Sequence, residues 1–174
     1  AGGAVGGNGG QAGAAEAAVQ KEVATASTAV TAAITKVNNP AEASPRAPEL
    51  VGISDWINSE PLKLSELRGK VVLVDFWTYT CINCIRTLPY LTMWHDKYGD
   101  KGLVIIGVHS PEFDFEKDLE NVKKAVAKYS IKYPVALDND HSTWRAFRNN
   151  YWPHKYLIDI DGKVRYDHIG EGGY

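Results

Sequence analysis

Apolar runs and amphipathic segments alternate through the last two thirds of the chain. The runs Val71–Phe76, which only Asp75 interrupts, and Leu103–Val108 have the length and composition of buried strands. Between and after them, residues 82–98 carry apolar side chains mixed with polar positions, and residues 115–130 form a charged segment with one apolar face. The pattern predicts two buried strands and two amphipathic helices.

The last third of the chain has shorter elements. Pro134–Leu137 predicts a short strand, Ser142–Asn149 a helix, and the sequence KYLIDIDGKVRYDHI a hairpin that turns at Asp161–Gly162. Strands that alternate with helices indicate a sheet that is covered on both faces and is partly parallel. The predicted fold class is therefore α/β, a central mixed sheet flanked by helices with the hairpin at an antiparallel edge.

The first fifty residues differ sharply, because they contain no aromatic residue. The Gly-rich start predicts flexibility, and Ala14–Val37, which lacks Gly and Pro, predicts an Ala-rich helical extension. Its apolar stripe consists of small residues, so a solvated spacer is as compatible with it as a packed helix. Three prolines then predict a linker. We expect a Gly/Ala-rich extension over 1–37, a linker over 38–49 and a folded domain over 50–174.

Charge and composition exclude several classes of function. The net charge is −2 with no basic stripe, which argues against nucleic acid, and no apolar run approaches the ~18 residues of a membrane span. The acidic stretches PEFDFEKDLE and LDNDHS lack the Gly and terminal Glu of a calcium loop. We expect no metal and no cofactor. Four histidines show no ligand spacing, and we expect them at the surface or at strand ends: His109, His141, His154 and His168.

The only two cysteines, Cys81 and Cys84, stand where a predicted strand runs into a predicted helix. A structural zinc site would need two more ligands, and His95 lies too far along the helix to share a metal with them. Two buried, inert cysteines are a second alternative. However, a helix N-terminus stabilises a thiolate. Cys81 would be exposed there and Cys84 shielded, which is the asymmetry that stepwise thiol–disulfide exchange requires.

Several ordered motifs carry a resemblance to a known family. VDFWTYTCINC resembles the thioredoxin superfamily, whose active-site strand places V-D-F-W three residues ahead of C-x-x-C. LSELRGKVVLVDFW, LVIIGV and YLIDIDGKV resemble the branch typified by TlpA and ResA, which acts outside the cytoplasm. WTYTCINCIRTLPYL, YWPHKYLID and GEGGY are closer still to the thioredoxin domain of DipZ-type cytochrome c biogenesis proteins. The resemblance covers residues from about 50 to 174 and implies a thioredoxin-like fold.

The resemblance also implies the catalytic residues. Cys81 corresponds to the nucleophile and Cys84 to the resolving cysteine, so a redox-active disulfide between them replaces any cofactor. Asp75 corresponds to the buried acid of thioredoxins. Burial should raise the pKa of this acid, which would let it exchange a proton with Cys84. Thr87 stands where ResA-like relatives often carry a glutamate, which leaves the acid role to Asp75.

The resemblance assigns substrate binding to Trp152, Pro153 and Trp77. Pro153 corresponds to the cis-proline that faces the dithiol, and the backbone of Trp152 would bond the edge of an extended substrate. Ile82 and Asn83 replace the Gly-Pro of general thioredoxins between the cysteines, a change that affects the redox potential.

The implied function is a thiol–disulfide oxidoreductase that reduces protein disulfides. We expect an extracytoplasmic, periplasmic or cell-envelope protein, tethered through its N-terminal segment, with a membrane electron donor of the CcdA type and a role in cytochrome c maturation. One alternative is a thiol peroxidase with the motif P-x-x-x-T-x-x-C, where Thr78 fits but Val74 replaces the proline. The other is a non-catalytic interaction module in which the dithiol is incidental.

The family continues with a helix after the hairpin, whereas this sequence ends at Tyr174. The last helix is therefore expected to be missing. We expect one face of the sheet near Val164–Ile169 to be uncovered, or to be covered by the helix predicted over Ala14–Val37.

Overall fold

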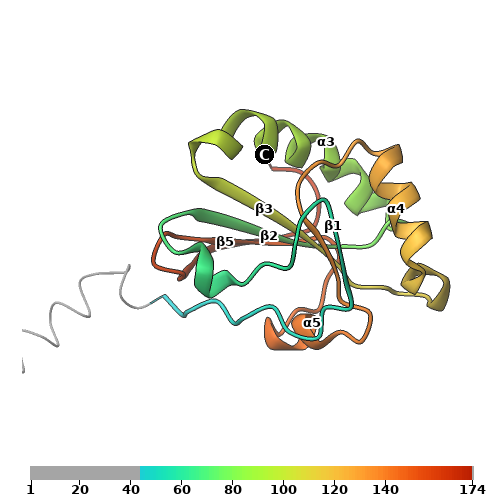
Figure 1. The fold of residues 1–174 in the computed structure, drawn as a ribbon, viewed down its shortest axis with the longest axis horizontal. Coiled ribbons are helices and arrows are strands. Elements are labelled where there is room, and N and C mark those ends of the chain that lie inside the picture. The colour runs from blue at the N-terminus through green and yellow to red at the C-terminus, as the bar shows by residue number, and fades with distance from the viewer. Residues whose placement is uncertain (1–43, 174) are drawn as a thin grey trace, which may run out of the picture. The chain divides into compact units, whose positions relative to one another are not determined.

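Residues 44–173 are described by the computed structural model, and they form a six-stranded sheet with helices against both faces (Figure 1). The strand order is β1-β4-β3-β2-β5-β6. The elements, in chain order, are β1 (Asp55–Ile57), η1 (Leu64–Leu67), β2 (Val71–Trp77), α3 (Ile82–Tyr98), η2 (Gly99–Lys101), β3 (Leu103–His109), η3 (Asp114–Lys117), α4 (Leu119–Lys128), β4 (Val135–Leu137), α5 (Ser142–Ala146), β5 (His154–Ile158) and β6 (Val164–Ile169).

The centre of the sheet is parallel and its edges are antiparallel. β2 pairs in parallel with β3 and β3 with β4, whereas β1, β5 and β6 each run antiparallel to their neighbour. β2 and β3 read as continuous apolar runs because helices cover both of their faces. The predicted mixed sheet with an antiparallel hairpin at its edge is confirmed.

Alternate residues of β2 enter two different cores. Leu73 and Trp77 pack with Cys84, Leu88 and Leu91 under α3 and α4. On the opposite face, Leu64 of η1 and Phe147 after α5 pack with buried side chains of β2. These are Val72, Val74 and Phe76. Since side chains alternate along a strand, Asp75 shares the face of Leu73 and Trp77 and points toward the helix that begins after Cys81.

Two predicted helices are shorter than the sequence pattern indicated. The segment 115–130 is divided into η3 and α4, because the Asp118 side chain accepts a hydrogen bond from the Asn121 N–H at 3.0 Å and starts a new helix. α5 ends at Ala146 instead of Asn149. The three-residue strand β1 gave no sequence signal, since it is too short for a periodic pattern.

The folded unit begins at Ser44, six residues before the start expected at Leu50. Arg46 forms an isolated antiparallel β-bridge with Lys163 of the hairpin. Further along, the carboxylate of Glu49 accepts hydrogen bonds from the N–H groups of Leu64 (2.6 Å) and Ser65 (3.0 Å) and so caps η1. The N-terminal limit of the domain therefore depends on polar contacts made by residues expected in the linker.

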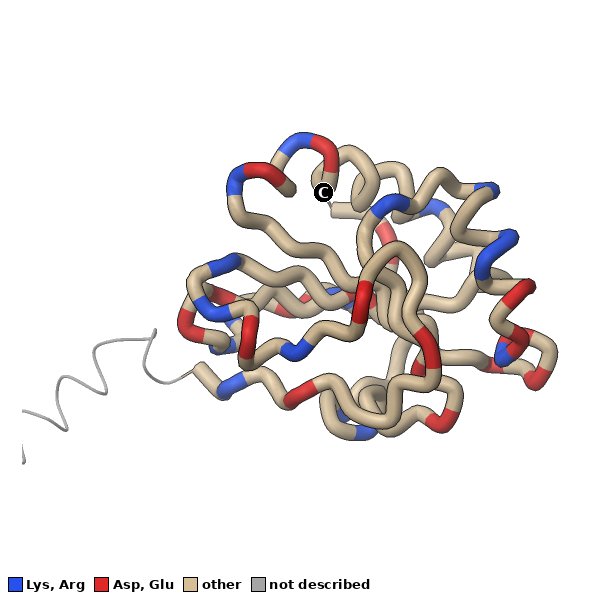
Figure 2. Tube along the Cα trace, viewed as in Figure 1, with Lys and Arg blue, Asp and Glu red and all other residues tan. Residues whose placement is uncertain are grey.

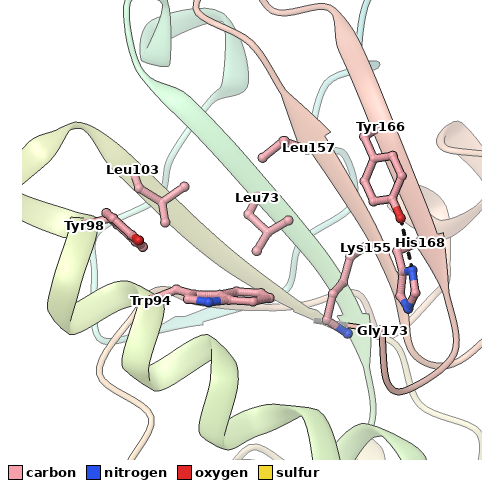
Figure 3. Close-up of a pocket in the computed structure, with 9 residues that line it drawn as sticks. All are labelled: Leu73, Trp94, Tyr98, Leu103, Lys155, Leu157, Tyr166, His168 and Gly173. Atoms are coloured by element: carbon pink, nitrogen blue, oxygen red, sulfur yellow. Dashed lines mark hydrogen bonds between the residues drawn. The ribbon is translucent and has the colours of Figure 1, made fainter.

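A hollow of about 270 Å³ lies between α3 and the β5–β6 hairpin (Figure 3). It is lined by Leu73, Trp94, Tyr98, Leu103, Lys155, Leu157, Tyr166, His168 and Gly173. Tyr166 of β6, which lines the hollow, is 60% exposed. Within residues 44–173, this face is therefore open, as we expected. The proposed cover, Ala14–Val37, lies outside the described residues. None of the described helices is long and apolar enough to cross a membrane.

Candidate active site

The two cysteines lie at the start of α3, a few residues after β2 ends. Cys81 is the N-cap residue, and its Sγ accepts a hydrogen bond from the backbone N–H of Cys84 at 3.2 Å. Both are free thiols. Cys81 is partly exposed, whereas Cys84 is fully buried. The predicted exposed and shielded pair is confirmed.

The surroundings shift the pKa values of the two thiols in opposite directions. A hydrogen bond from the Cys84 thiol, together with the N–H groups of Cys84 and Asn83, lowers the pKa of Cys81 to about 7, against the opposing effects of partial burial and of the Glu112 charge. Burial, and then the same interaction with Cys81, raises the pKa of Cys84. Near neutral pH, Cys81 is therefore about half thiolate, whereas an ordinary cysteine is ionised to a few per cent.

Asp75 is fully buried on β2, as the sequence predicted, and it has a charged partner that the sequence analysis missed. Lys155 lies directly opposite Asp75 on the antiparallel strand β5, and its Nζ is 3.2 Å from Asp75 Oδ1. The Lys155 side chain is itself only 4% exposed. Burial raises the pKa of the Asp75 carboxyl, and the Lys155 charge opposes that rise.

Lys155 also connects the dithiol to the open hollow between α3 and the hairpin. Its Nζ lies 3.3 Å from Thr87 Oγ1, and the Thr87 hydroxyl donates to the Cys84 carbonyl at 2.9 Å. The charge of Asp75 also contributes to raising the pKa of Cys84. Figure 3 shows the Lys155 side chain in the lining of the hollow. The charged partner of the buried Asp75 carboxyl is therefore also part of the wall of the hollow.

The peptide bond between Trp152 and Pro153 is cis, as the resemblance implied. The Trp152 indole N–H donates to the Ser110 carbonyl at 3.0 Å, and its ring packs on Trp144 with centroids 4.3 Å apart. The side chain of Trp152 thereby fastens the segment before β5 to the loop after β3. Substrate binding by the backbone of Trp152 stays a prediction.

Trp77 does not reach the surface. It is fully buried in the core under α3 and α4, so its side chain has no area to offer a substrate. The prediction that Trp77 binds substrate is wrong. The alternation of side chains along β2 places Trp77 on the same face as Asp75, under α3 and α4. Motif matching does not consider this consequence.

The sequence analysis also missed a polar cluster beneath the loop before Cys81. The carboxylate of Glu116, a fully buried residue of η3, accepts hydrogen bonds from the Thr80 hydroxyl and from the N–H groups of Glu112 (2.6 Å) and Phe113 (3.0 Å). Burial alone would raise the pKa of Glu116, but these bonds outweigh it, so the pKa is lowered and the group stays charged.

His109 was expected at the surface or at a strand end; it is the last residue of β3, and its side chain is fully buried. Its Nε2 lies 3.3 Å from Thr78 Oγ1, and its ring stacks on Tyr79 with centroids 5.6 Å apart. Burial lowers the pKa of His109 to about 4, so the ring is neutral at pH 7. It therefore supports the active-site loop as a packing group without charge.

Comparison with known proteins agrees with this geometry. The model of the AhpC/TSA family matches residues 46–167, which is more than half of the chain. The chain belongs to the AhpC/TSA family.

Among the similar members of this family, DipZ from Mycobacterium tuberculosis is 52% identical over 136 residues, which cover 76% of this chain and 20% of DipZ. The chain thus spans about a fifth of that relative. The thiol-disulfide oxidoreductase YkuV from Bacillus subtilis is 32% identical over 126 residues, covering 72% of this chain and 84% of YkuV.

Two solved structures resemble the domain closely. A thioredoxin-like protein in its oxidised form superposes with a TM-score of 0.68 at 32% identity, covering 75% of this chain and 86% of that one. A thiol-disulfide isomerase from Corynebacterium glutamicum gives 0.64 at 29% identity, with coverages of 72% and 88%. These similarities place the chain among the thioredoxin-like thiol–disulfide oxidoreductases.

Proposed function

We propose that the chain reduces disulfide bonds of proteins, with Cys81 as the attacking thiol and Cys84 as the resolving thiol. The observation that supports this most strongly is the asymmetry of the pair at the N-terminus of α3. Cys81 is accessible and has a pKa lowered to about 7, whereas Cys84 is fully buried one turn further into the helix. One sulfur is ready to attack a large substrate, and the other can react only within the molecule.

The reaction proceeds through two exchanges. The Cys81 thiolate attacks one sulfur of the substrate disulfide, and the other substrate sulfur leaves as a thiolate that takes up a proton. Cys84 then loses its proton and attacks Cys81 Sγ, which releases the second substrate thiol and forms the Cys81–Cys84 disulfide. Two electrons pass from the enzyme dithiol to the substrate, and an external dithiol must return them for the next turnover.

Asp75 is the group that we assign to the second exchange. The thiol of Cys84 has a raised pKa and needs a base when it attacks. The carboxylate of Asp75 lies behind it with its own pKa raised by burial, which brings the acid closer to the thiol in proton affinity. The Lys155 charge favours the ionised form of Asp75, and the Lys155 side chain also lines the open hollow.

Substrate binding is proposed at the loop that contains Trp152 and Pro153, on the strength of the family resemblance. In this arrangement, the backbone of Trp152 pairs with an extended substrate segment while the substrate disulfide lies over Cys81. The contacts of the Trp152 indole with Ser110 and Trp144 would hold that backbone in place.

The direction and place of the reaction are inferred from similarity to DipZ. We propose a reductant in an extracytoplasmic compartment that receives electrons from a membrane donor of the CcdA type and serves cytochrome c maturation. Peroxide reduction has less support. The Thr78 hydroxyl that the peroxidase motif would need is buried and lies against His109 Nε2.

Insulin reduction and peroxide consumption test the proposal, together with the redox potential. The reduced protein should reduce insulin disulfides with dithiothreitol as electron source, and it should equilibrate with glutathione at a potential near the ~−270 mV of thioredoxin. A potential near ~−120 mV would make it an oxidant. Rapid consumption of hydrogen peroxide without insulin reduction would establish the peroxidase instead, and inactivity in both assays would leave only the interaction module.

A further inference from the structure

Two phenylalanines are exposed on the loop between β3 and α4. Phe113 is 48% exposed and Phe115 is 54% exposed, and their rings stack on each other with centroids 5.5 Å apart and an angle of 6° between planes. Single exposed apolar side chains are common, but a stacked pair on a short loop forms a continuous apolar surface of the kind that marks contact sites.

This surface lies beside the attacking cysteine. The Tyr79 hydroxyl donates to the Phe115 carbonyl at 3.2 Å, and the two rings lie 6.5 Å apart in an edge-on arrangement. Tyr79 is two residues before Cys81, and the next residue, Thr80, donates to buried Glu116. We call Tyr79, Phe113 and Phe115 the aromatic ridge.

The aromatic ridge is held in a fixed conformation. Glu116 binds the N–H groups of Glu112 and Phe113 as well as the Thr80 hydroxyl, so one buried carboxylate joins the ridge to the active-site loop. A surface that is ordered before binding loses little conformational entropy when a partner docks on it.

The ridge has an acidic border. Residues 112–120 contain five carboxylates and one lysine, and Figure 2 shows acidic residues gathered where the loop enters α4. Lys117 is already paired with Asp114 at 2.7 Å. Glu112 is exposed and close enough to the dithiol for its charge to act on Cys81. A cation on the partner would find a complementary charge at Glu112.

Next to Tyr79 the ridge has neighbours of the other sign of charge. Tyr79 forms one wall of an open hollow whose other walls include Lys124 and Lys128 of α4. A basic partner residue is therefore attracted toward Glu112 and repelled from Lys124 and Lys128. These charges of opposite sign give a docked segment a preferred direction on the ridge.

We propose that the aromatic ridge and Glu112 select protein substrates in which an apolar residue adjoins a lysine or arginine near the reacting disulfide. The apolar side chain packs on Phe113 and Phe115, and the basic side chain pairs with Glu112. This proposal rests on the proposed function, because it concerns which disulfides reach Cys81.

The test uses three disulfide peptides that differ only beside the reacting cysteine, with Leu-Lys, Leu-Glu or Ser-Lys at that place, and the small neutral compound 2-hydroxyethyl disulfide. The second-order rate constant for oxidation of the pre-reduced full chain is measured with each substrate at low and moderate salt. Peptide rates are divided by the rate with the small disulfide for every protein variant. We expect the Leu-Lys peptide to react about tenfold faster than the other two, with the advantage over Leu-Glu shrinking as salt rises.

Variants assign that preference to the ridge. Phe113→Ala combined with Phe115→Ala should remove most of the advantage of leucine over serine, and Glu112→Gln should reduce that of lysine over glutamate about threefold. Ile160→Ala and Asp161→Asn are matched controls. They lie in the hairpin turn beyond Ile158, which pairs with Val72 at the end of the sheet remote from Cys81.

Equal normalised rates for all three peptides, or a preference that survives both ridge variants, would overturn the docking proposal while leaving the oxidoreductase intact. Failure to reduce even 2-hydroxyethyl disulfide would instead overturn the proposed function. A Leu-Lys preference that the control variants also abolish would show that the selectivity does not come from the ridge.

Discussion

Replacing Lys155 by methionine removes the only charge that the structure places against buried Asp75, among the residues it describes, and keeps most of the side-chain volume. At the observed separation of 3.2 Å and an effective dielectric constant of about 20, the attraction is about 5 kcal/mol. Side chains and water rearrange around a buried charge, so only part of this energy changes the proton affinity of the carboxyl. Because the Lys155 charge opposes the effect of burial, we expect its removal to raise the pKa of Asp75 further.

The assay is a pH titration of the Asp75 carboxyl carbon by NMR, in protein labelled with ¹³C at aspartate. Asp75→Asn identifies the signal by its loss. Lys70→Met, which removes an exposed lysine before the start of β2, should leave the midpoint where it is in the unaltered protein. The Lys155→Met protein should also accumulate mixed disulfides, because a carboxyl locked in its protonated form cannot accept the proton of Cys84. A midpoint within about half a unit of the unaltered protein would refute the pairing argument.

The same pair affects stability with a definite sign. The folded pKa of Asp75 is raised, so the folded state binds that proton more tightly than the unfolded state, whose pKa is about 3.9. The stability that Asp75 contributes is present below about pH 4 and is lost as pH rises through the folded pKa. Without Lys155 this loss should continue to higher pH, and adding Asp75→Asn should abolish it. Urea unfolding between pH 4 and 8 measures the difference.

Two further predictions concern the loop and the thiols. Alkylation of Cys81 by iodoacetamide should rise with a midpoint near pH 7, and peptide mass spectrometry should find Cys84 at least ~100-fold slower; equal labelling would contradict the assigned roles. Glu116→Gln should lower the free energy of unfolding by about 2 kcal/mol, because an amide cannot accept all the hydrogen bonds that the buried carboxylate accepts. Thr80→Val should lower it less. If Glu116→Gln leaves the free energy of unfolding unchanged, the carboxylate does not hold the loop.

The sequence predicted those features that depend on local pattern. The apolar runs of β2 and β3 and the start of α3 after Cys81 follow from periodicity and from the change of period at the cysteines. The contrast between an exposed Cys81 and a shielded Cys84 also follows, since the position along a helix determines which side chain lies at its end.

Features that depend on register between distant segments could not be predicted. Asp75 and Lys155 are partners only because β5 pairs with β2 in one particular register, and a shift of one residue would turn Lys155 to the other face. Glu116 reaches the active-site loop through the conformation of an irregular segment, which has no periodic signal. Trp77 was assigned from its place in a motif, although the continuous apolar run of β2 already predicted a strand that is buried on both faces.

The most direct test of the central claim is to trap the mixed disulfide. Cys84→Ser protein, reduced and mixed with a peptide that carries one disulfide, should form a one-to-one covalent adduct through Cys81 that mass spectrometry detects and dithiothreitol releases. Cys81→Ser protein, with its remaining thiol fully buried and its pKa raised, should form none on the same timescale. An adduct on Cys84, or no adduct with either variant, would contradict the assignment of Cys81 as the attacking thiol of a thiol–disulfide oxidoreductase.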